Sequence, residues 1–212
     1  ASCLSRLGRR EDALALHEAA LAMLRRLFAG NHPEIAACLH NLAACLDQIG
    51  RHEEALAHYE AALRMNEELI GGDHPNIVIC LHAVGGCLES LRRFDEALVR
   101  HEAALAMRRR LLGDDHPSLA SSHVWVARSL EALGRKDEAL ASYEAALAAY
   151  ERMGPGGEPQ VAVCARHIAR CLAALDRLEQ AVGYAERADA LVSRQVPEGH
   201  AVRVSSGRGL RP

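Results

Sequence analysis

The heptapeptide GRHEEAL at residues 50–56 decides the fold, because close copies of it recur along the chain at a constant step. The copies are GRREDAL (8–14), RRFDEAL (92–98), GRKDEAL (134–140) and the more divergent DRLEQAV (176–182). Each begins 42 residues after the one before, with no insertion. Self-similarity at a fixed period of roughly 20–50 residues is typical of stacked structural repeats. The sequence therefore predicts a repeat array and not a single globular core.

A second marker keeps the same step and indicates where one helix of each unit begins. The pairs His32-Pro33, His74-Pro75 and His116-Pro117 are followed in this register by Glu158-Pro159 and His200-Ala201. A polar residue followed by Pro favours a helix start, because the first turn of a helix leaves its N–H groups unbonded. Gly at 8, 50 and 134 is suited to the end of that helix. Each unit is predicted as helix A, a Gly turn, helix B and a loop, with helix A at about 33–49 and helix B at about 52–70 in the best copy.

The apolar residues have helical spacing, which predicts an all-α fold. Helix A of the best copy carries one apolar stripe: Ile35, Leu39, Leu42, Ala43, Leu46 and Ile49. Helix B carries two columns that hold Ala in every unit, at 13, 55, 97, 139 and 181 and at 20, 62, 104, 146 and 188. Small residues there let neighbouring helices approach closely.

The period also divides the chain. We expect a repeat array over residues 1–200, consisting of a partial repeat at 1–31 and repeats at 32–73, 74–115, 116–157 and 158–199. Residues 201–212 are predicted to be a frayed tail or the remnant of a capping helix, and the GPGG at 154–157 a variant turn. The chain starts at Ala1 without Met, which we interpret as a sign of a longer protein. Because arrays need polar caps, an uncovered helix near 178–191 could support self-association.

The composition argues against several function classes. The net charge is −3, from 25 Lys and Arg against 28 Asp and Glu, which gives no basic surface for nucleic acid or an anionic membrane. No apolar run approaches the roughly 20 residues that span a bilayer. No signal peptide is visible.

The repeat register also predicts structural roles for residues that could otherwise suggest chemistry. All seven Cys lie in two helix A columns, Cys3, Cys45, Cys87 and Cys171 in one and Cys38, Cys80 and Cys164 in the other. We expect buried thiols there, no metal site, no cofactor and no catalytic residue. Free thiols without a disulfide framework fit a reducing, cytoplasmic compartment. His32, His74 and His116 are interpreted as helix caps, and the arginines 108–110 as a solvated helix face.

The pattern resembles the tetratricopeptide repeat, in its kinesin light chain subclass. Helix B has Tyr59 and Tyr143 in an aromatic column shared with His17 and His101, and the 42-residue period, the Asp-His-Pro opening and Asn41-Leu42-Ala43 follow that subclass. The resemblance implies a right-handed α-solenoid of antiparallel helix pairs that binds proteins. HEAT-type repeats of about 40–47 residues are the rival fold. The Gly turn and the two Ala columns favour the tetratricopeptide repeat over it. The subclass's paired Asn is kept only at Asn41, so its cargo contacts carry over nowhere else.

Function is expected where the repeats differ. The curvature of a solenoid creates an extended concave surface, which helix A lines in the family that this chain resembles. The helix A positions that vary between units are proposed to line a groove: His40, Asn41, Asp47, His82, Glu89, Trp125, Arg128, Glu131, Arg166 and Arg170. Because the arginines gather late in the chain, we expect an acidic segment of a partner near the last two units.

Three functional interpretations remain open. The first is a scaffold that binds a protein or peptide in this groove. The second is a sensor or oligomerisation segment of a larger signalling regulator, linked to an ATPase or a protease and found in bacterial or algal proteins. The third is a cargo adaptor of the kinesin light chain type. An enzyme is disfavoured, because no Ser-His-Asp arrangement, phosphate-binding loop or dinucleotide fingerprint is present.

Overall fold

The computed structural model describes residues 10–195, and this part is built from helices without a β-strand. The α-helices are α2 (Arg10–Leu27), α3 (Pro33–Gln48), α4 (His52–Ile70), α5 (Pro75–Ser90), α6 (Phe94–Leu112), α7 (Leu119–Ala132), α8 (Lys136–Arg152), α9 (Glu158–Ala173) and α10 (Leu178–Gln195). The odd-numbered helices are the A helices and the even-numbered ones the B helices. The expected all-α fold is confirmed. The expectations for residues 1–9 and 196–212 lie outside the described residues.

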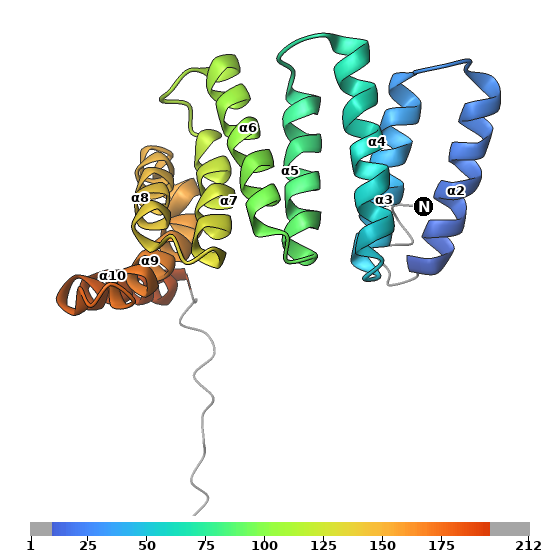
Figure 1. Ribbon diagram of the computed structural model, residues 1–212. Helices are drawn as coiled ribbons and strands as arrows, with labels where there is room; N and C mark the ends of the chain where they lie inside the picture. Colours follow the sequence, from blue (N-terminus) through green and yellow to red (C-terminus); the bar gives the residue numbers. More distant parts are fainter. Residues whose placement is uncertain (1–9, 196–212) are drawn as a thin grey trace, which may run out of the picture.

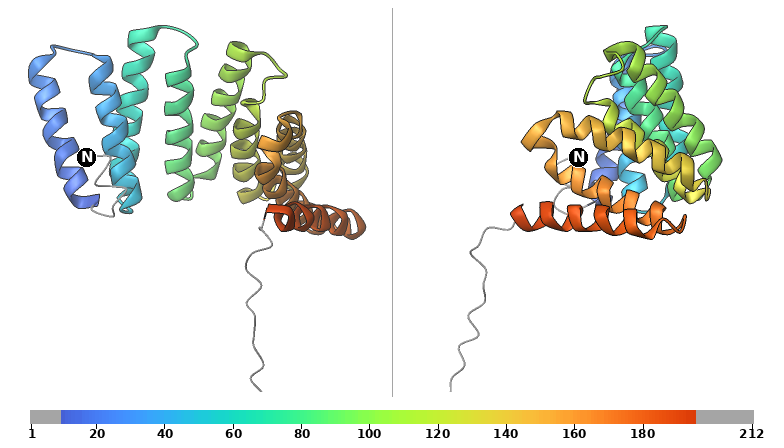
Figure 2. Two further views of the ribbon diagram at one scale, coloured as in Figure 1. Left: turned by 180° about the vertical axis from the view of Figure 1, so that it is seen from behind. Right: turned by 90° about the vertical axis from the view of Figure 1, so that its left-hand side faces the viewer.

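The helices form a solenoid. Each one packs chiefly against the helix before it and the helix after it in the chain. Helices α2 to α7 stand side by side, and the axes then turn, so that α10 lies across the direction of α2 (Figure 1). The end-on view shows the same rotation along the array (Figure 2). Because every unit meets its neighbours in a similar way, corresponding junctions can be compared residue by residue.

The A helices begin at the predicted His-Pro pairs, with one exception. The Nδ1 atoms of His32 and His74 accept hydrogen bonds from the backbone N–H of Glu34 and Asn76, at 3.2 and 3.1 Å. His116 accepts the same bond from Ser118 at 3.1 Å, but α7 begins only at Leu119. The first turn is tightened there, because the Leu119 and Ala120 N–H groups bond three residues back, to the His116 and Pro117 carbonyls.

The B helices begin with a repeated ion pair that the sequence interpretation did not foresee. Acidic residues lie in the first turn, as predicted from the helix dipole. In three units the last of them also pairs with the Arg at the N-cap, with closest approaches of 2.5 to 2.7 Å: Arg51–Glu54, Arg93–Glu96 and Arg135–Glu138. In α10 the partner is the neutral Gln180, at 2.7 Å from Arg177.

The GPGG segment expected to be a turn forms a short 3₁₀ helix, η1 (Gly154–Gly157).

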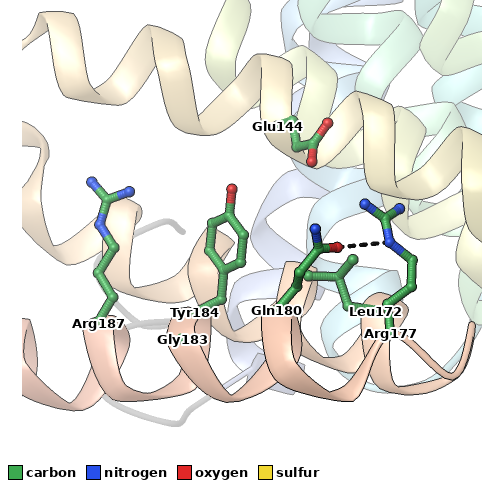
Figure 3. A pocket seen from close by; sticks show the side chains of 7 residues that line it. All are labelled: Glu144, Leu172, Arg177, Gln180, Gly183, Tyr184 and Arg187. Atoms are coloured by element: carbon green, nitrogen blue, oxygen red, sulfur yellow. Dashed lines mark hydrogen bonds between the residues drawn. The ribbon is translucent and has the colours of Figure 1, made fainter.

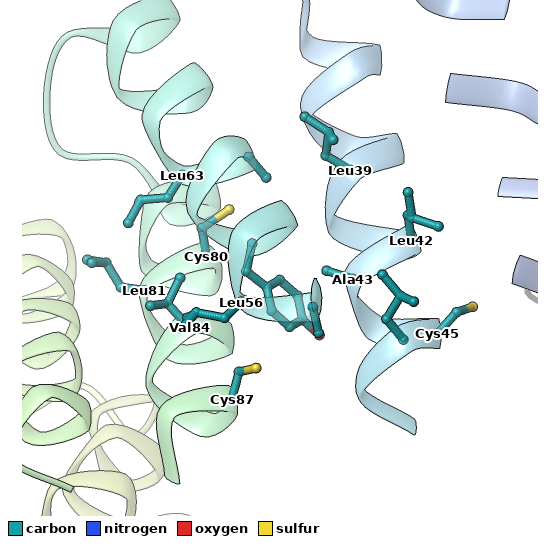
Figure 4. Packing of buried hydrophobic residues seen from close by; sticks show 14 of the residues in the cluster. Leu39, Leu42, Ala43, Cys45, Leu56, Leu63, Cys80, Leu81, Val84 and Cys87 are labelled. Carbon is teal, nitrogen blue, oxygen red and sulfur yellow. The ribbon is translucent and has the colours of Figure 1, made fainter. Parts of the chain in front are cut away.

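The core follows the predicted columns. Figure 4 shows stripe residues of α3 (Leu39, Leu42, Ala43) and their counterparts in α5 (Leu81, Val84), which belong to one buried cluster. The Ala columns are fully buried along most of their length, for example at Ala55, Ala62, Ala97 and Ala104. Ala20 was expected in this column but is exposed. Among the described helices, α3 is the only one that packs extensively against α2.

The thiols pack as the columns predict. The six described cysteines are buried, and none of them is in a disulfide: Cys38, Cys45, Cys80, Cys87, Cys164 and Cys171. Burial raises the pKa of Cys87 to about 12 and the pKa of Cys164 to about 11. Thiols in this state are poor nucleophiles and poor metal ligands.

Candidate functional site

The ten residues expected to line a groove all lie on the A helices, but they fall into different environments. They come from α3 (His40, Asn41, Asp47), α5 (His82, Glu89), α7 (Trp125, Arg128, Glu131) and α9 (Arg166, Arg170). The structure brings five of them together in two equivalent clusters that bridge successive repeats. It brings His40 and Asn41 together at a pocket. The remaining residues are engaged singly.

The first cluster joins α5, α6 and α7, and we call it clamp 1: Glu89, His101, Trp125 and Arg128. The Arg128 guanidinium is 3.0 Å from a carboxylate oxygen of Glu89 and lies over the Trp125 ring, 4.6 Å from its centroid. The Trp125 ring stacks on the imidazole of His101 at 5.3 Å. Glu89 also accepts a hydrogen bond from Ser129 at 3.0 Å. The clamp therefore ties three helices together.

The second cluster repeats this arrangement one unit later, and we call it clamp 2: Glu131, Tyr143, His167 and Arg170. Arg170 donates two hydrogen bonds to Glu131, at 2.6 and 2.7 Å, and Tyr143 donates a third at 3.1 Å. The His167 ring stacks on Tyr143, with 4.7 Å between the centroids. Each member stands 42 residues after its counterpart in clamp 1. The clamp is thus a feature of the repeat itself.

The clamps neutralise two of the arginines that were expected to attract an acidic guest. Burial opposes ionisation of Glu89 and Glu131, but the Arg charges and the hydrogen bonds outweigh it and lower the pKa of both carboxyls. Both acids are therefore ionised near neutral pH, opposite Arg128 and Arg170. Arg166 is less engaged, since its nearest acid is the exposed Asp189 at 3.7 Å.

A buried polar chain continues from clamp 1 into α6. The Nδ1 atoms of His82 and His101 lie 3.2 Å apart, and the Nε2 of His82 is 3.0 Å from the hydroxyl of Ser122. Arg108 donates to that hydroxyl at 2.7 Å. Burial, aided by His101 and Arg108, lowers the pKa of His82 to about 3. His82 is therefore neutral, and its ring joins α5 to α6 and α7.

One further expectation is wrong. Arg108 was interpreted as part of a solvated face, but it is half-buried and bonds to Ser118, Ser121 and Ser122. His101, which shares the aromatic column of helix B, is fully buried. Its ring lies against the glycine at position 85, where the neighbouring units have Ala. An added Cβ at Gly85 would come within 2.4 Å of the His101 ring.

The junction between α3 and α5 lacks the clamp. The positions that correspond to Trp125 and Arg128 are Ala83 and Gly86, which offer neither a ring nor a charge. A Cβ added at Gly86 would meet no atom within 4 Å. Asp47 instead pairs with His52 of the same unit, at 2.7 Å. The first junction is therefore more open than the two that follow it.

A pocket of about 200 Å³ lies at this open junction. It is lined by Pro33, Ala36, Ala37, His40 and Asn41 from α3, Asn66 from α4, and Asn76, Ile79 and Cys80 from α5. No charged residue lines it. Asn66 is 8% exposed and donates to the Ala62 carbonyl and the Cys80 sulfur, at 3.0 and 3.4 Å. The Nδ1 of His40 is buried without a hydrogen-bond partner, and burial lowers the pKa of that ring.

A second pocket, of about 320 Å³, lies between the B helices α8 and α10. Tyr184 and Arg187 rise from α10 toward α8, and Glu144 faces them from α8 (Figure 3). Arg187 pairs with Glu151, and Arg177 bonds to Gln180 within the pocket. It involves none of the ten residues predicted from the sequence.

Other chemistry finds little support in the described part of the chain. Among residues 10–195, no three His, Cys, Asp or Glu side chains converge as metal ligands would. No described helix has the length and apolar character needed to cross a bilayer.

Sequence reasoning missed seven of the nine residues that line the first pocket, among them the polar Asn66 and Asn76 and the exposed Ile79. It looked for columns that vary between units only along the A helices. The B-helix column that holds Asn66, Arg108 and Tyr150 changes its chemistry in every unit, and that change was the available signal.

The comparisons with known proteins agree with this geometry. The sequence profile of the tetratricopeptide repeat matches residues 1–68, 48–109 and 81–152. No curated protein matches the sequence significantly.

Several solved structures share the fold. A kinesin light chain-like protein of Podosopora anserina with nearly identical TPR-like repeats superposes with a TM-score of 0.80 at 22% identity, over 91% of this chain and 92% of the other. BtubC (BKLC) of P. vanneervenii gives a TM-score of 0.83 at 19% identity, over 99% and 79%. A Rap protein in complex with competence and sporulation factor gives a TM-score of 0.68 at 17% identity, over 91% of this chain and 51% of the other.

Proposed function

The chain belongs to the tetratricopeptide repeat family, and we propose that it is a protein-binding scaffold whose guest lies along the groove lined by α3, α5, α7 and α9. The observation that carries this proposal is the pocket at the first junction, where the Nδ1 of His40 is buried without a hydrogen-bond partner among the described residues and the side chains of Asn41 and Asn76 are exposed. Buried polar groups without partners are costly, and a bound chain could satisfy them.

The proposed guest-facing residues are the ten positions at which the A helices differ. His40 and Asn41 stand at the pocket and are the most available. The guest would meet the other side chains on the faces that their internal contacts leave exposed. These side chains are Asp47, His82, Glu89, Trp125, Arg128, Glu131 and Arg170. Arg166 is the arginine best placed to meet a carboxylate of the guest, because it is more than half exposed and weakly paired.

An acidic guest would have to compete with the molecule's own acids. At Arg128 and Arg170, Glu89 and Glu131 already occupy the guanidinium groups. An acidic segment of the guest was expected near the last two units, and Arg166 is the one of these three arginines that we still propose as its binding site. The groove at the first junction favours an uncharged segment.

Site-specific photo-crosslinking tests the proposal. Peptides are selected on the intact chain from a displayed random 12-residue library. The photoreactive residue p-benzoylphenylalanine is then placed at exposed positions on the A helices (Asn41, Asn76) and, as matched controls, on the B helices (Leu16, Val99). We expect crosslinks from the A-helix positions. Crosslinks confined to the B-helix positions, or no selected peptide, would contradict a guest in this groove.

We propose further that the chain is not an enzyme. The acids Glu89 and Glu131 and the imidazoles of His101 and His167 are engaged in clamps that join repeats, and burial raises the pKa of the Cys87 and Cys164 thiols. The same thiols support a reducing compartment such as the cytoplasm, where free cysteines persist.

Self-association through the last helix is a second role that one observation favours. Leu178 and Val182 of α10 are 61% and 55% exposed, so this helix presents apolar side chains that no described element covers. Light scattering tests the idea. A mass that falls to that of the single chain when both residues become Glu would support it, and a single-chain mass in the parent protein would reject it.

The broader biological settings stay open beside these proposals. A sensor segment of a signalling regulator and a cargo adaptor of the kinesin light chain type both need a scaffold of this kind. The structures that share the fold include a kinesin light chain-like protein and a Rap protein complexed with competence and sporulation factor, at identities that bear on the fold alone.

A further inference from the structure

The pocket between α3 and α5 has counterparts at the next two junctions, and there the chain fills the corresponding place itself. The B-helix position that holds Asn66 at the first junction holds Arg108 at the second and Tyr150 at the third. The Arg108 guanidinium donates to the Ser118 carbonyl and to the hydroxyls of Ser121 and Ser122, at 3.0, 2.9 and 2.7 Å. Tyr150 packs against the core cluster that includes Cys164. The shorter Asn66 reaches only one of the corresponding groups, the sulfur of Cys80 at 3.4 Å.

The residues that line the pocket also differ from those that surround Arg108 at the second junction. Ser118, Ser121 and Ser122, which receive the Arg108 side chain, correspond to Asn76, Ile79 and Cys80. Two hydroxyl acceptors are thus replaced by an aliphatic chain and a thiol. A cation placed here would lose the partners that Arg108 has. The exposed Ile79, with Ala37 and Pro33 opposite, instead offers an apolar wall.

The rim of the pocket carries amides. Asn41 and Asn76 are exposed, and their side chains make no hydrogen bond to another described residue. The amide of Asn66, buried at the pocket, donates twice, but its Oδ1 accepts no bond from the described part of the chain. Side-chain amides both donate and accept, as the peptide backbone does. A backbone that crosses the rim could therefore pair with them.

The size of the pocket limits what can enter it. Pockets for drug-sized ligands measure about 300–1,000 Å³. At about 200 Å³, this one suits a single small side chain better than a cofactor.

We propose that this pocket receives one small, uncharged, apolar side chain from an extended segment of a partner protein, whose backbone pairs with Asn41 and Asn76. The inference rests on the proposed scaffold function and adds the chemistry of the guest and its place on the array. Binding centres on the first junction because Arg108 and Tyr150 occupy the corresponding places at the next two.

The test uses peptides selected on the intact chain from a displayed random 12-residue library, with dissociation constants measured by fluorescence anisotropy. Ala37→Phe fills the pocket from an exposed position. Val163→Phe is the matched control, because Val163 is exposed in the same helix A column three repeats later and does not line the pocket. We expect a consensus with one small apolar residue among uncharged ones. We also expect binding at least about tenfold weaker with Ala37→Phe and within about twofold of the parent with Val163→Phe.

A second variant separates loss of fit from loss of folding. Asn41→Ala removes a rim amide from an exposed site, and we expect about fivefold weaker binding with an unchanged circular dichroism spectrum. Peptides that bind Ala37→Phe and Asn41→Ala as well as the parent would overturn the inference. If such peptides still crosslinked to A-helix positions, the scaffold proposal would survive. Selected peptides with an acidic consensus, whose binding is lost with Arg166→Glu, would likewise overturn the inference and leave the scaffold proposal standing. Failure to select any peptide would count against both proposals.

Discussion

His82 shows how a single residue can link the stability of this array to pH. Its imidazole is held between His101 and Ser122, with Arg108 beyond, and its pKa is lowered to about 3. The hydrogen bonds are satisfied if Arg108 donates to Ser122, Ser122 to His82, and His82 to His101. Protonating His82 would break this order and place a second positive charge next to Arg108.

The pH dependence follows from the sign of that shift. In the unfolded chain His82 takes up a proton near pH 6.5, whereas in the folded chain it stays neutral down to about pH 3. The free energy of unfolding should therefore fall as the pH falls below about 6.5. Between pH 7.5 and 5.0 we expect a loss of roughly 2 kcal/mol from this residue.

Urea unfolding at the two pH values measures that loss. Other imidazoles whose pKa is lowered by burial, such as His40 and His123, add to it in the same direction. His82→Gln is the comparison, because it cannot take up the proton. A variant with the same pH dependence as the parent would show that His82 is not the source.

Two adjacent glycines give a matched test of close packing. Gly85 and Gly86 both lie inside α5, but only at Gly85 would an added Cβ meet His101, at 2.4 Å. We expect Gly85→Ala to lower the free energy of unfolding by about 1–3 kcal/mol, because the ring must move. Gly86→Ala should raise it by up to about 1 kcal/mol, because Ala favours a helix and the site is open. Equal effects in thermal or urea unfolding would refute the close contact with His101.

At the scale of the element, the turn between helices A and B depends on one left-handed residue. Gly50 and Gly134 adopt it with φ of 83° and 76°. Arg92 and Asp176 take the same conformation with φ of 60° and 58°. A side chain in this region costs about 1–2 kcal/mol, and less for Asp than for Arg.

Replacing these residues by Gly should therefore stabilise the protein. We expect Arg92→Gly to raise the free energy of unfolding by about 0.5–1 kcal/mol, after the loss of its contact with the Phe94 ring. Asp176→Gly should raise the free energy of unfolding by a smaller amount, because Asp tolerates the left-handed conformation better than Arg does. Chemical denaturation checks both values, and a loss of stability in Arg92→Gly would mean that the turn relies on the Arg side chain.

The elements themselves were the part of the fold most readily predicted from the sequence. The His-Pro pairs, the Gly turn and the Ala columns placed α3 and α4 to within one residue, because each feature acts locally. The delayed start of α7 was not predictable in this way. It accompanies a contact between Ser118 and Arg108, which is half-buried on another helix.

At the scale of the whole molecule, the clamps set how strongly one repeat depends on the next. Stability in a solenoid is roughly a sum of repeat terms and interface terms. Clamps 1 and 2 strengthen the later junctions, whereas the first junction has neither a ring nor an Arg at the corresponding positions. The molecule thus combines a more firmly joined C-terminal part with a more open N-terminal junction.

A double-mutant cycle on clamp 2 tests this coupling. Arg170 is 62% exposed, so Arg170→Gln should cost less than about 1 kcal/mol. Glu131→Gln should cost more, because Glu131 also accepts from Tyr143. The coupling energy from urea unfolding should be about 0.2–1 kcal/mol and should shrink in high salt. A coupling of zero would leave the pair without a role in joining the repeats.

The candidate site could be predicted only in part, because it depends on contacts between residues of different repeats. The A-helix columns pointed to a variable face and to His40 and Asn41. Whether an Arg is available to a guest depends on what stands 39 residues away, as Glu131 does from Arg170. The pocket depends on the short side chain of Asn66, which becomes meaningful only beside Arg108 in the next unit.

The groove of the A helices is proposed to bind an extended guest at its first junction. A crystal structure of the chain with a peptide selected on it would locate that guest. We expect the peptide to lie across α3 and α5, with a small apolar side chain between Ala37 and Ile79 and its backbone against Asn41 and Asn76. A peptide bound along the B helices, or lying on α9 with the first pocket empty, would contradict it.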